Sequence, residues 1–251
     1  MGTKNDLRTV SIIQARMGST RLPGKVLVDI EGEPMLVRVV ERAKRAETLQ
    51  TVVVATTVEP QDDVVAALCV ERGYQYERGH PTDVLTRYLN VTHKYRADVI
   101  VRLTGDCPLI DPEVIDYTVT LFLNSEPRVD YASNRIIRTY PIGLDVEVMT
   151  MGALERAGLE AKELYQREHV TPYLYEEPGR FRVVSVESGG DYGRLRWTVD
   201  TAEDLAFVRE IYARFNGQDN FGWRDVLALL EKEPELIAIN THVRQKGLRE
   251  A

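Results

Sequence analysis

The segment IIQARMGSTRLPGKVL, residues 12 to 27, decides the fold, because an apolar strand pattern runs directly into a loop that is rich in cations. The run VSIIQAR, residues 10 to 16, lacks the polar alternation of a half-exposed strand and predicts a strand that is buried on both faces. After it, Arg16 can grip two phosphate oxygens at once, Gly18 lets the backbone approach an anion closely, and Lys25 adds a point charge. The pattern favours a phosphate-binding loop over a solvated basic turn.

This loop is not a Walker A motif. Five residues separate Gly18 from Gly24, one more than the motif allows, and Lys25 is followed by Val26 instead of Ser or Thr. Because the hydroxyl that ligates magnesium in a Walker A site is missing, any metal ion must be held elsewhere in the chain.

Around the loop, buried apolar runs alternate with helical patterns. Two further strands are predicted at TVVVATT (51–57) and ADVIVRLTGD (97–106). The helical patterns cover residues 34–46, 60–72, 83–95 and the segment that follows an N-cap at Asp111. This alternation predicts an α/β fold with a mostly parallel sheet and helices on both faces.

After about residue 125 the alternation becomes less regular. Strands are predicted at 140–150 and 180–188, a helical region at 152–178, and a returning core strand at GRLRWTVD (193–200), before a helix capped by Thr201. We expect one domain over residues 1–251, in which about 125–190 form a smaller substrate-cap or dimer-contact flap. The polar tail, 241–251, is expected to be loosely held.

Three polar residues follow predicted strands: Arg16, Asp106 and Asp200. Taken singly, each has a structural explanation, such as a surface ion pair, a braced turn or a helix dipole. Taken together, a cationic loop and two carboxylates at strand ends suit a metal–triphosphate, since magnesium takes one or two carboxylates plus phosphate oxygens. The sequence therefore predicts Mg²⁺ held by the two aspartates.

The loop sequence QARMGSTRLPGKVL resembles the opening motif of the cytidylyltransferases that activate sugar acids, such as 3-deoxy-manno-octulosonate and the acylneuraminates. The similarity continues in VVVATT, ERGHPTDVLTRY, RLTGDCPLIDPEVID, PIGLDVEV, REHVTPYLY and TVDTAEDL, and it spans residues 10 to about 215. The first motif and the closing VDTAEDL are specific when they occur together. Within the family, the chain is most similar to the spore coat polysaccharide branch.

The resemblance implies a glycosyltransferase-A-like (Rossmann-like) fold and transfer of CMP from CTP to a sugar acid of nonulosonic or octulosonic type, with release of pyrophosphate. It implies that Arg16 and Lys25 hold the triphosphate and that Arg78 reads the cytosine ring. The nucleotide-binding residues that it implies are Ala15, Arg16, Gly18, Ser19, Arg21, Lys25, Thr56, Arg78 and Gly105. The catalytic residues are then Arg16, Lys25, Asp106 and Asp200, of which the two aspartates ligate Mg²⁺.

On the acceptor side the chain departs from the octulosonate enzymes, which have an aromatic, glycine-rich stretch there. Here GLDVEV places Asp145 and Glu147, which suit hydroxyls or an amine and repel an acceptor carboxylate unless a cation intervenes. Glu168 and His169 match the family's sugar-facing helix, although a buried pair on a helix face explains them equally well. These four residues are the predicted substrate-binding set, and the acceptor sugar stays open.

Bulk properties limit the partners. The net charge of −7 gives no attraction to nucleic acid or to an anionic membrane, and no apolar stretch has the length of a membrane span. We expect a cytoplasmic homodimer. One alternative is a nucleotidyltransferase for a sugar phosphate or phosphonate, although such loops usually begin with a G-x-G pattern. The other is a non-catalytic nucleotide-binding protein of the same fold, which would not need both aspartates.

Overall fold

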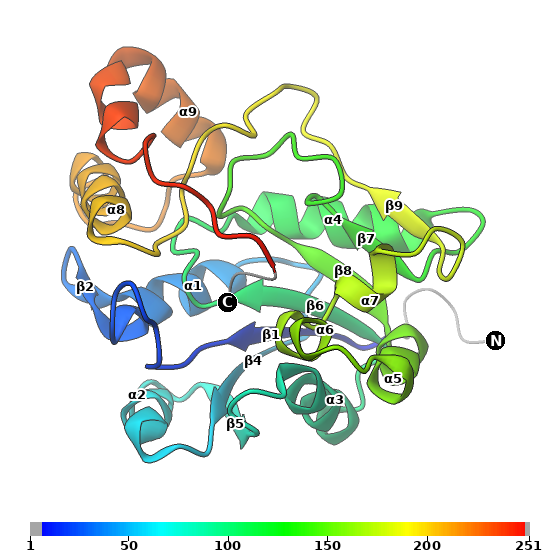
Figure 1. Ribbon diagram of the computed structural model, residues 1–251. Coiled ribbons are helices and arrows are strands. Elements are labelled where there is room, and N and C mark those ends of the chain that lie inside the picture. The colour runs from blue at the N-terminus through cyan, green and yellow to red at the C-terminus, as the bar shows by residue number, and fades with distance from the viewer. Residues whose placement is uncertain (1–6, 249–251) are drawn as a thin grey trace.

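The three predicted strands that frame the cationic loop form the centre of a seven-stranded sheet in the computed structural model, which describes residues 7–248 (Figure 1). The strands are β1 (Thr9–Gln14), β4 (Thr51–Thr57), β5 (Gln75–Gly79), β6 (Val99–Thr104), β7 (Tyr131–Ser133), β8 (Glu147–Thr150) and β9 (Val183–Ser185). Their order is β5-β4-β1-β6-β8-β7-β9. The first four are parallel, whereas β8 is antiparallel to both of its neighbours. The predicted mostly parallel sheet is confirmed.

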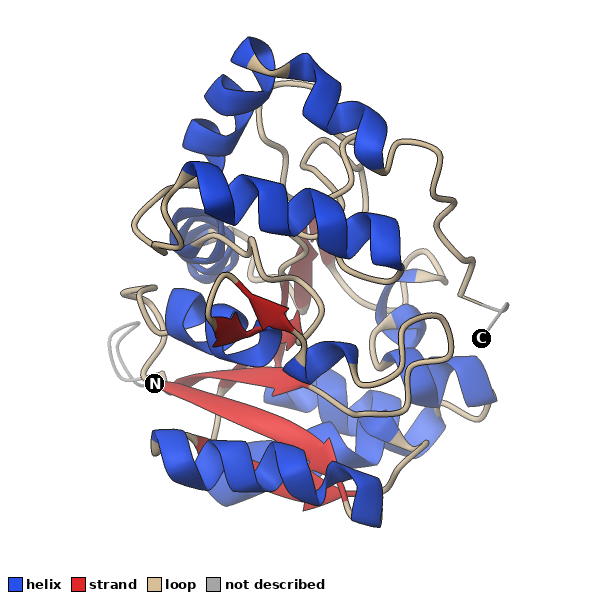
Figure 2. Cartoon of the chain, turned by 90° about the vertical axis from the view of Figure 1, so that its left-hand side faces the viewer, coloured by secondary structure: helices blue, strands red, loops and turns tan. Residues whose placement is uncertain are grey.

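Helices cover both faces of this sheet, as Figure 2 shows. They are α1 (Met35–Ala43), α2 (Asp63–Arg72), α3 (Val84–Tyr95), α4 (Pro112–Asn124), α5 (Met151–Glu160), α6 (Leu164–His169), α7 (Pro172–Tyr175), α8 (Ala202–Arg214) and α9 (Trp223–Lys232). Side chains alternate along each strand, so Ile13 packs with α1, α4 and α8, while Ile12 packs on the other face with α3, α5 and α7. Because both faces are buried, the central strands are continuously apolar.

Several helix ends follow the predicted signals. Asp111 caps α4 by accepting from the backbone N of Glu113 at 2.9 Å, and Thr201 forms a capping box with Asp204 at the start of α8. Helix α2 ends at Gly73, whose φ of 67° lies in the left-handed region that favours glycine.

The second half of the chain differs from the prediction in its details. The strand predicted at 140–150 is reduced to β8, and the helical region 152–178 is three helices, with a break at Val170, whose φ is 70°. The hairpin of β2 (Asp29–Ile30) and β3 (Glu33–Pro34) was not predicted, nor was β7.

The strand predicted at 193–200 is wrong. That segment is extended and buried at Trp197 and Val199, but it pairs with loops instead of joining the sheet. The N–H of Trp197 donates to the carbonyl oxygen of Ile142 at 2.6 Å, and that of Val199 donates to the carbonyl oxygen of Asp106 at 2.8 Å. A buried extended connection has the same apolar pattern as a strand, so the sequence could not separate the two.

The strand order identifies one place at the edge of the sheet where a ligand can bind. Strand β1 lies between β4 and β6, and the chain leaves β1 toward β4 before it crosses back to β6. In open α/β sheets, the crevice beyond the carboxyl ends at such a switch point is where ligands bind. Within residues 7–248, no helix has the length and apolar character needed to cross a membrane.

Candidate active site

A cavity of about 570 Å³ opens at the carboxyl ends of β1 and β6. Its wall combines the loop after β1, the loop after β6, the start of α3, the segment 135–145 and the end of α6. Asp200 and residues 245–248 complete it. Segments that are far apart in the sequence therefore meet at the switch point of the sheet.

The loop after β1 is shaped by hydrogen bonds around Met17. Its carbonyl oxygen accepts from the backbone N of Ser19 at 2.8 Å and of Gly24 at 3.1 Å. Gly24 has φ of 71°, so the turn needs a residue that tolerates the left-handed region. The N–H of Met17 donates to the fully buried carboxylate of Asp62 at 2.6 Å. Asp62 thus anchors the loop, a role that its place in a helical pattern did not reveal.

Lys25 connects the two aspartates that were predicted to meet. Its Nζ lies 2.8 Å from Oδ2 of Asp106, 2.8 Å from Oδ1 of Asp200 and 2.9 Å from the carbonyl oxygen of Val199. Burial acts to lower the pKa of Lys25, but the two carboxylates outweigh it and raise that pKa above its ordinary value. Burial likewise acts to raise the pKa of Asp106, and the ammonium of Lys25 lowers it to about 2. Lys25 and Asp106 are therefore both charged at neutral pH.

Asp200 is surrounded by cations. Besides Lys25, it accepts from Arg196 at 2.8 Å and pairs with Arg21 at 2.9 Å. Arg196 is itself buried and also binds Asp204, the N-terminal capping-box residue of α8, at 2.8 Å. The start of α8 therefore holds Asp200 in place through Arg196.

The predicted magnesium ligands suit such an ion by their chemistry. Two carboxylates converge on one positive charge, which here is the ammonium of Lys25, and magnesium commonly takes one or two carboxylates plus phosphate oxygens. In residues 7–248 no group of three or more His, Cys, Asp or Glu is arranged to hold a metal, so further ligands would come from a bound nucleotide. Magnesium binding stays a prediction.

Arg16 and Glu168 form an ion pair across the cavity mouth. Nη2 of Arg16 lies 3.2 Å from Oε1 of Glu168, and Nη1 donates to the carbonyl oxygen of Pro81 at 3.2 Å. The pair links the loop after β1 to α6. Beside it, Nε2 of His169 donates to the carbonyl oxygen of Leu248 at 3.0 Å. Burial, with Arg102 nearby, lowers the pKa of His169, which favours the neutral ring.

The acceptor side of the cavity carries three arginines, Arg102, Arg135 and Arg138. Arg138 makes a two-point ion pair with Asp145, at 2.7 and 3.2 Å. Arg102 donates to the buried carboxylate of Glu147, which also lies 3.3 Å from Arg135. An acceptor carboxylate next to Asp145 would require cations nearby, and these three arginines provide them.

Glu147 is the centre of a buried network under this wall. It accepts from the hydroxyls of Tyr131 at 2.6 Å and Thr171 at 2.7 Å, in addition to its arginine partners. Burial acts to raise the pKa of Glu147, but Arg102 and Arg135 lower it to about 2. With 1% of its surface exposed, Glu147 holds the arginines and does not face the cavity.

The structure brings most predicted site residues to the cavity wall. They are Ala15, Arg16, Gly18, Ser19, Arg21, Lys25, Gly105, Asp106, Asp145, Glu168, His169 and Asp200. Their roles toward nucleotide and acceptor stay predictions.

Three of the predicted site residues do not line the cavity, and their binding roles stay predictions. Glu147 is buried beneath the wall, and Thr56 is fully buried in β4. Arg78, on the edge strand β5, donates to the carbonyl oxygen of Thr57 at 2.8 Å and pairs with Asp63 at 2.7 Å. Arg78 therefore braces the connection between β4 and α2.

Sequence reasoning missed several wall residues, among them Arg87, Arg102, Arg135, Arg138 and Thr198. One signal was available: Arg102 interrupts the apolar strand VIVRLT, and a cation in a buried strand requires a partner or a ligand. The tail was also missed, because residues 245–248 lie on the wall instead of hanging free.

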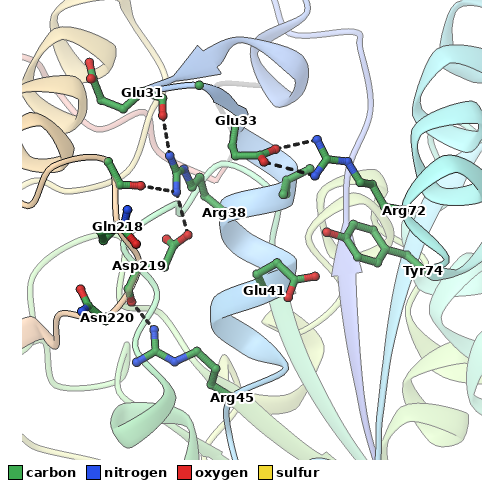
Figure 3. A pocket seen from close by; sticks show the side chains of 13 residues that line it. Glu31, Glu33, Arg38, Glu41, Arg45, Arg72, Tyr74, Gln218, Asp219 and Asn220 are labelled. Carbon is green, nitrogen blue, oxygen red and sulfur yellow. Dashed lines mark hydrogen bonds and ion pairs between the residues drawn. The ribbon is translucent and has the colours of Figure 1, made fainter.

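A second cavity, of about 870 Å³, lies beside α1 and away from the strand ends (Figure 3). Its charged side chains largely satisfy one another: Arg72 pairs with Glu33 at 2.6 Å, and Arg38 pairs with Asp219 at 2.7 Å. This cavity lies away from the phosphate-binding loop, the two aspartates and the switch point of the sheet. The cavity at β1 and β6 is therefore the candidate active site.

Comparison with known proteins gives a consistent result. Residues 10–217 match a family model described as cytidylyltransferase. The chain is 41% identical to the uncharacterized protein MJ1063 of Methanocaldococcus jannaschii, over 97% of this chain and 99% of the relative. It is 32% identical to the spore coat polysaccharide biosynthesis protein SpsF of Bacillus subtilis, over 89% of this chain and 94% of the relative. It is 39% identical to a 3-deoxy-manno-octulosonate cytidylyltransferase of Geobacter sulfurreducens, over 73% of this chain and 71% of the relative.

Solved structures share the fold. A cytidylyltransferase from Leptospira borgpetersenii has a TM-score of 0.89 and 34% identity, covering 96% of this chain and all of the other. A CMP:2-keto-3-deoxy-manno-octonic acid synthetase solved with CTP has a TM-score of 0.62, with 83% of this chain and 99% of that chain covered; at 23% identity it supports the fold alone.

Proposed function

The chain belongs to the cytidylyltransferase family of CTP-dependent nucleotidyltransferases, and on that premise we propose that it transfers CMP from CTP to a sugar acid and releases pyrophosphate. The family membership confirms the resemblance seen in the loop after β1 and in TVDTAEDL. The sugar-acid acceptor is our proposal, and relatives named as 3-deoxy-manno-octulosonate cytidylyltransferases support it.

The sugar-acid class of the acceptor is supported mainly by the three arginines on the cavity wall, Arg102, Arg135 and Arg138. Arg102 and Arg135 share Glu147, and Arg138 is paired with Asp145, so the guanidinium groups are held in place before any ligand arrives. Planar guanidinium groups recognise carboxylates by two parallel hydrogen bonds. A sugar bearing a carboxylate fits this wall better than a neutral sugar.

In the proposed reaction a hydroxyl oxygen of the sugar acid forms a bond to the α-phosphorus of CTP. The bond from that phosphorus to the bridging oxygen breaks, pyrophosphate leaves with the electron pair, and the hydroxyl proton is released. Such a displacement depends mainly on positioning and on neutralising the charge that develops on oxygen.

The loop after β1 supplies the cations for the leaving pyrophosphate. Each of its three cations pairs with a carboxylate of the site. Arg16 pairs with Glu168, Arg21 pairs with Asp200, and Lys25 pairs with both Asp106 and Asp200. We propose that these carboxylates hold the cations in position until a bound triphosphate takes the place of the carboxylates. Gly18 and Ser19 line the same pocket; the amide of Ser19 is bonded to the carbonyl oxygen of Met17, and that of Gly18 can donate to a phosphate oxygen.

Asp106 and Asp200 are the residues that would hold Mg²⁺, which when bound neutralises phosphate charge and aligns the reacting oxygens. Glu168, His169 and Asp145 are proposed to contact acceptor hydroxyls, since they line the same side as the arginines. We further expect the enzyme to act as a cytoplasmic homodimer that supplies an activated sugar acid for a surface polysaccharide.

The test is pyrophosphate release from CTP with Mg²⁺ and a panel of nonulosonic and octulosonic acids, with ATP, GTP and UTP as nucleotide controls. We expect release that requires both CTP and an acid. Turnover with a sugar 1-phosphate or a phosphonate in place of the acids would move the acceptor to that class, and CTP binding without turnover for any acceptor would favour a non-catalytic role.

A further inference from the structure

The end of the chain returns to the candidate active site. After α9 and the 3₁₀ segment Pro234–Ile239, residues 240–248, here called the C-terminal strap, run back toward the carboxyl end of β6 (Figure 1). Gln245, Lys246, Gly247 and Leu248 line the cavity. The strap lies beyond residue 217, where the match to the family model ends.

Three anchors hold the strap in this place. At its base, the buried amide of Asn240 donates to the carbonyl oxygen of Arg196 at 2.9 Å and to Asp204 at 3.0 Å. Farther along, Arg196 donates to the side chain of Gln245, and His169 donates to the carbonyl oxygen of Leu248 at 3.0 Å. The strap therefore spans the cavity from the group that holds Asp200 to the end of α6.

Lys246 lies between the last two anchors and differs from every other cation on the wall. Within residues 7–248, Lys246 is the cavity-lining cation for which the structure gives no hydrogen-bond or ion-pair partner. The others are engaged: those on the loop after β1 pair with Asp106, Glu168 and Asp200, and the acceptor-side arginines pair with Asp145 and Glu147. Arg87 donates to the carbonyl oxygen of His80 at 2.9 Å.

An unpaired ammonium at the mouth of a cavity that receives a polyanion requires no carboxylate to leave before it can bind. Both anchors beside it also touch the triphosphate region, because Arg196 binds Asp200 and His169 follows Glu168, the partner of Arg16. This argument rests on the proposed function, since the polyanion in question is the triphosphate of CTP.

We propose that the C-terminal strap is a second phosphate-binding element of the nucleotide site, in which Lys246 binds the triphosphate of CTP together with the cations of the loop after β1. The strap between Asn240 and Leu248 is largely exposed, so it can move aside to admit the nucleotide and return onto it. The wall of the nucleotide site is then complete only when the strap is in place.

The direct test compares CTP binding to the wild type and to Lys246→Met by calorimetry without acceptor. We expect about fivefold weaker binding, because one charge-assisted contact to phosphate is lost. Lys246→Arg should restore most of the affinity. The matched control is Lys232→Met, which removes an exposed lysine at the end of α9, outside the cavity, and should leave binding unchanged.

A second measurement follows the strap itself. Hydrogen exchange at the amides of residues 241–248 should slow when CTP binds, and it should slow less in Lys246→Met. Equal CTP affinity in the wild type and Lys246→Met, or a loss confined to the acceptor KM, would overturn the proposal.

Inorganic tripolyphosphate separates this inference from the proposed function, because it carries the phosphates without the base. If no sugar acid supports turnover but tripolyphosphate binding weakens in Lys246→Met, the strap inference stands and the acceptor assignment fails. If turnover with a sugar acid is found while neither CTP nor tripolyphosphate binding depends on Lys246, the strap inference fails alone. A wild-type protein that binds neither ligand would contradict both.

Discussion

Nζ of Lys25 lies 2.8 Å from Oδ2 of Asp106, although 81 positions separate the two residues in the chain. The same nitrogen touches Asp200, so one ammonium holds together the ends of two distant segments. A buried charge of this kind is stable only when it is paired, and each partner keeps the other ionised. The proposed chemistry depends on this junction, which can be tested one group at a time.

The aspartates are the first test. Asp106→Asn or Asp200→Asn should remain folded and lose on the order of a hundredfold or more in kcat, because each removes one charge from the proposed metal site. Binding of Mn²⁺, followed by its paramagnetic resonance in the presence of CTP, should weaken in parallel. Near-normal turnover by both folded variants would remove the metal assignment.

Arg16 is the second test. Arg16→Ala should weaken CTP binding far more than cytidine binding, because a guanidinium that grips phosphate has nothing to hold on the nucleoside. The control is Arg156→Ala, since Arg156 is exposed, lies outside the cavity and pairs with Glu160 on the surface. Calorimetry with both ligands gives the comparison, and equal losses for CTP and cytidine in Arg16→Ala would refute the phosphate role.

Arg138 tests the acceptor side. Arg138→Gln should raise the KM for a sugar acid about tenfold and leave the Kd for CTP unchanged, because one two-point contact to the acceptor carboxylate is lost. Arg224→Gln, an exposed arginine paired with Glu113 outside the cavity, should change neither constant. An effect of Arg138→Gln on CTP binding alone would assign that arginine to the nucleotide.

The pKa of Glu147 predicts a pH dependence of stability. Its folded-state pKa of about 2 lies below the ordinary 4.5, so folding favours the ionised form. The resulting contribution, about 3 kcal/mol, is present above the unfolded-state pKa and is lost as the pH falls from there toward 2. Urea unfolding of the wild type should show this loss, whereas Glu147→Gln should be less stable at neutral pH and show a shallower acid slope. Identical slopes would mean that another group carries the acid sensitivity.

The sequence sufficed for the central sheet because its signals are local. The strands β1, β4 and β6 are mostly apolar runs without the alternation of a half-exposed strand, and Asp111, Gly73 and Thr201 mark helix ends through contacts within a few residues. The same locality placed Arg16 and Asp106 at the ends of strands that a parallel sheet brings together, with Lys25 in the loop that follows the first of them.

The remaining features depend on pairings between distant segments. Asp200 reaches the site from an extended connection that hydrogen-bonds to the loop after β6, which no periodicity distinguishes from a strand. The network of Arg102, Arg135 and Glu147 combines β6, β8 and a loop, and only the tertiary structure brings these together. The strap was assigned as loose because its sequence is polar, yet its position is set by Arg196 and His169, which lie elsewhere in the chain.

The antiparallel pairing of β8 with β6 joins the flap to the main sheet through continuous backbone hydrogen bonds. A joint of this kind has no hinge, so the wall that we propose to face the acceptor cannot swing away as a body. A change of sugar preference must therefore come from exchanging side chains on a rigid frame, and relatives with other acceptors should differ at this wall in residue identity while keeping the backbone path of β6 and β8.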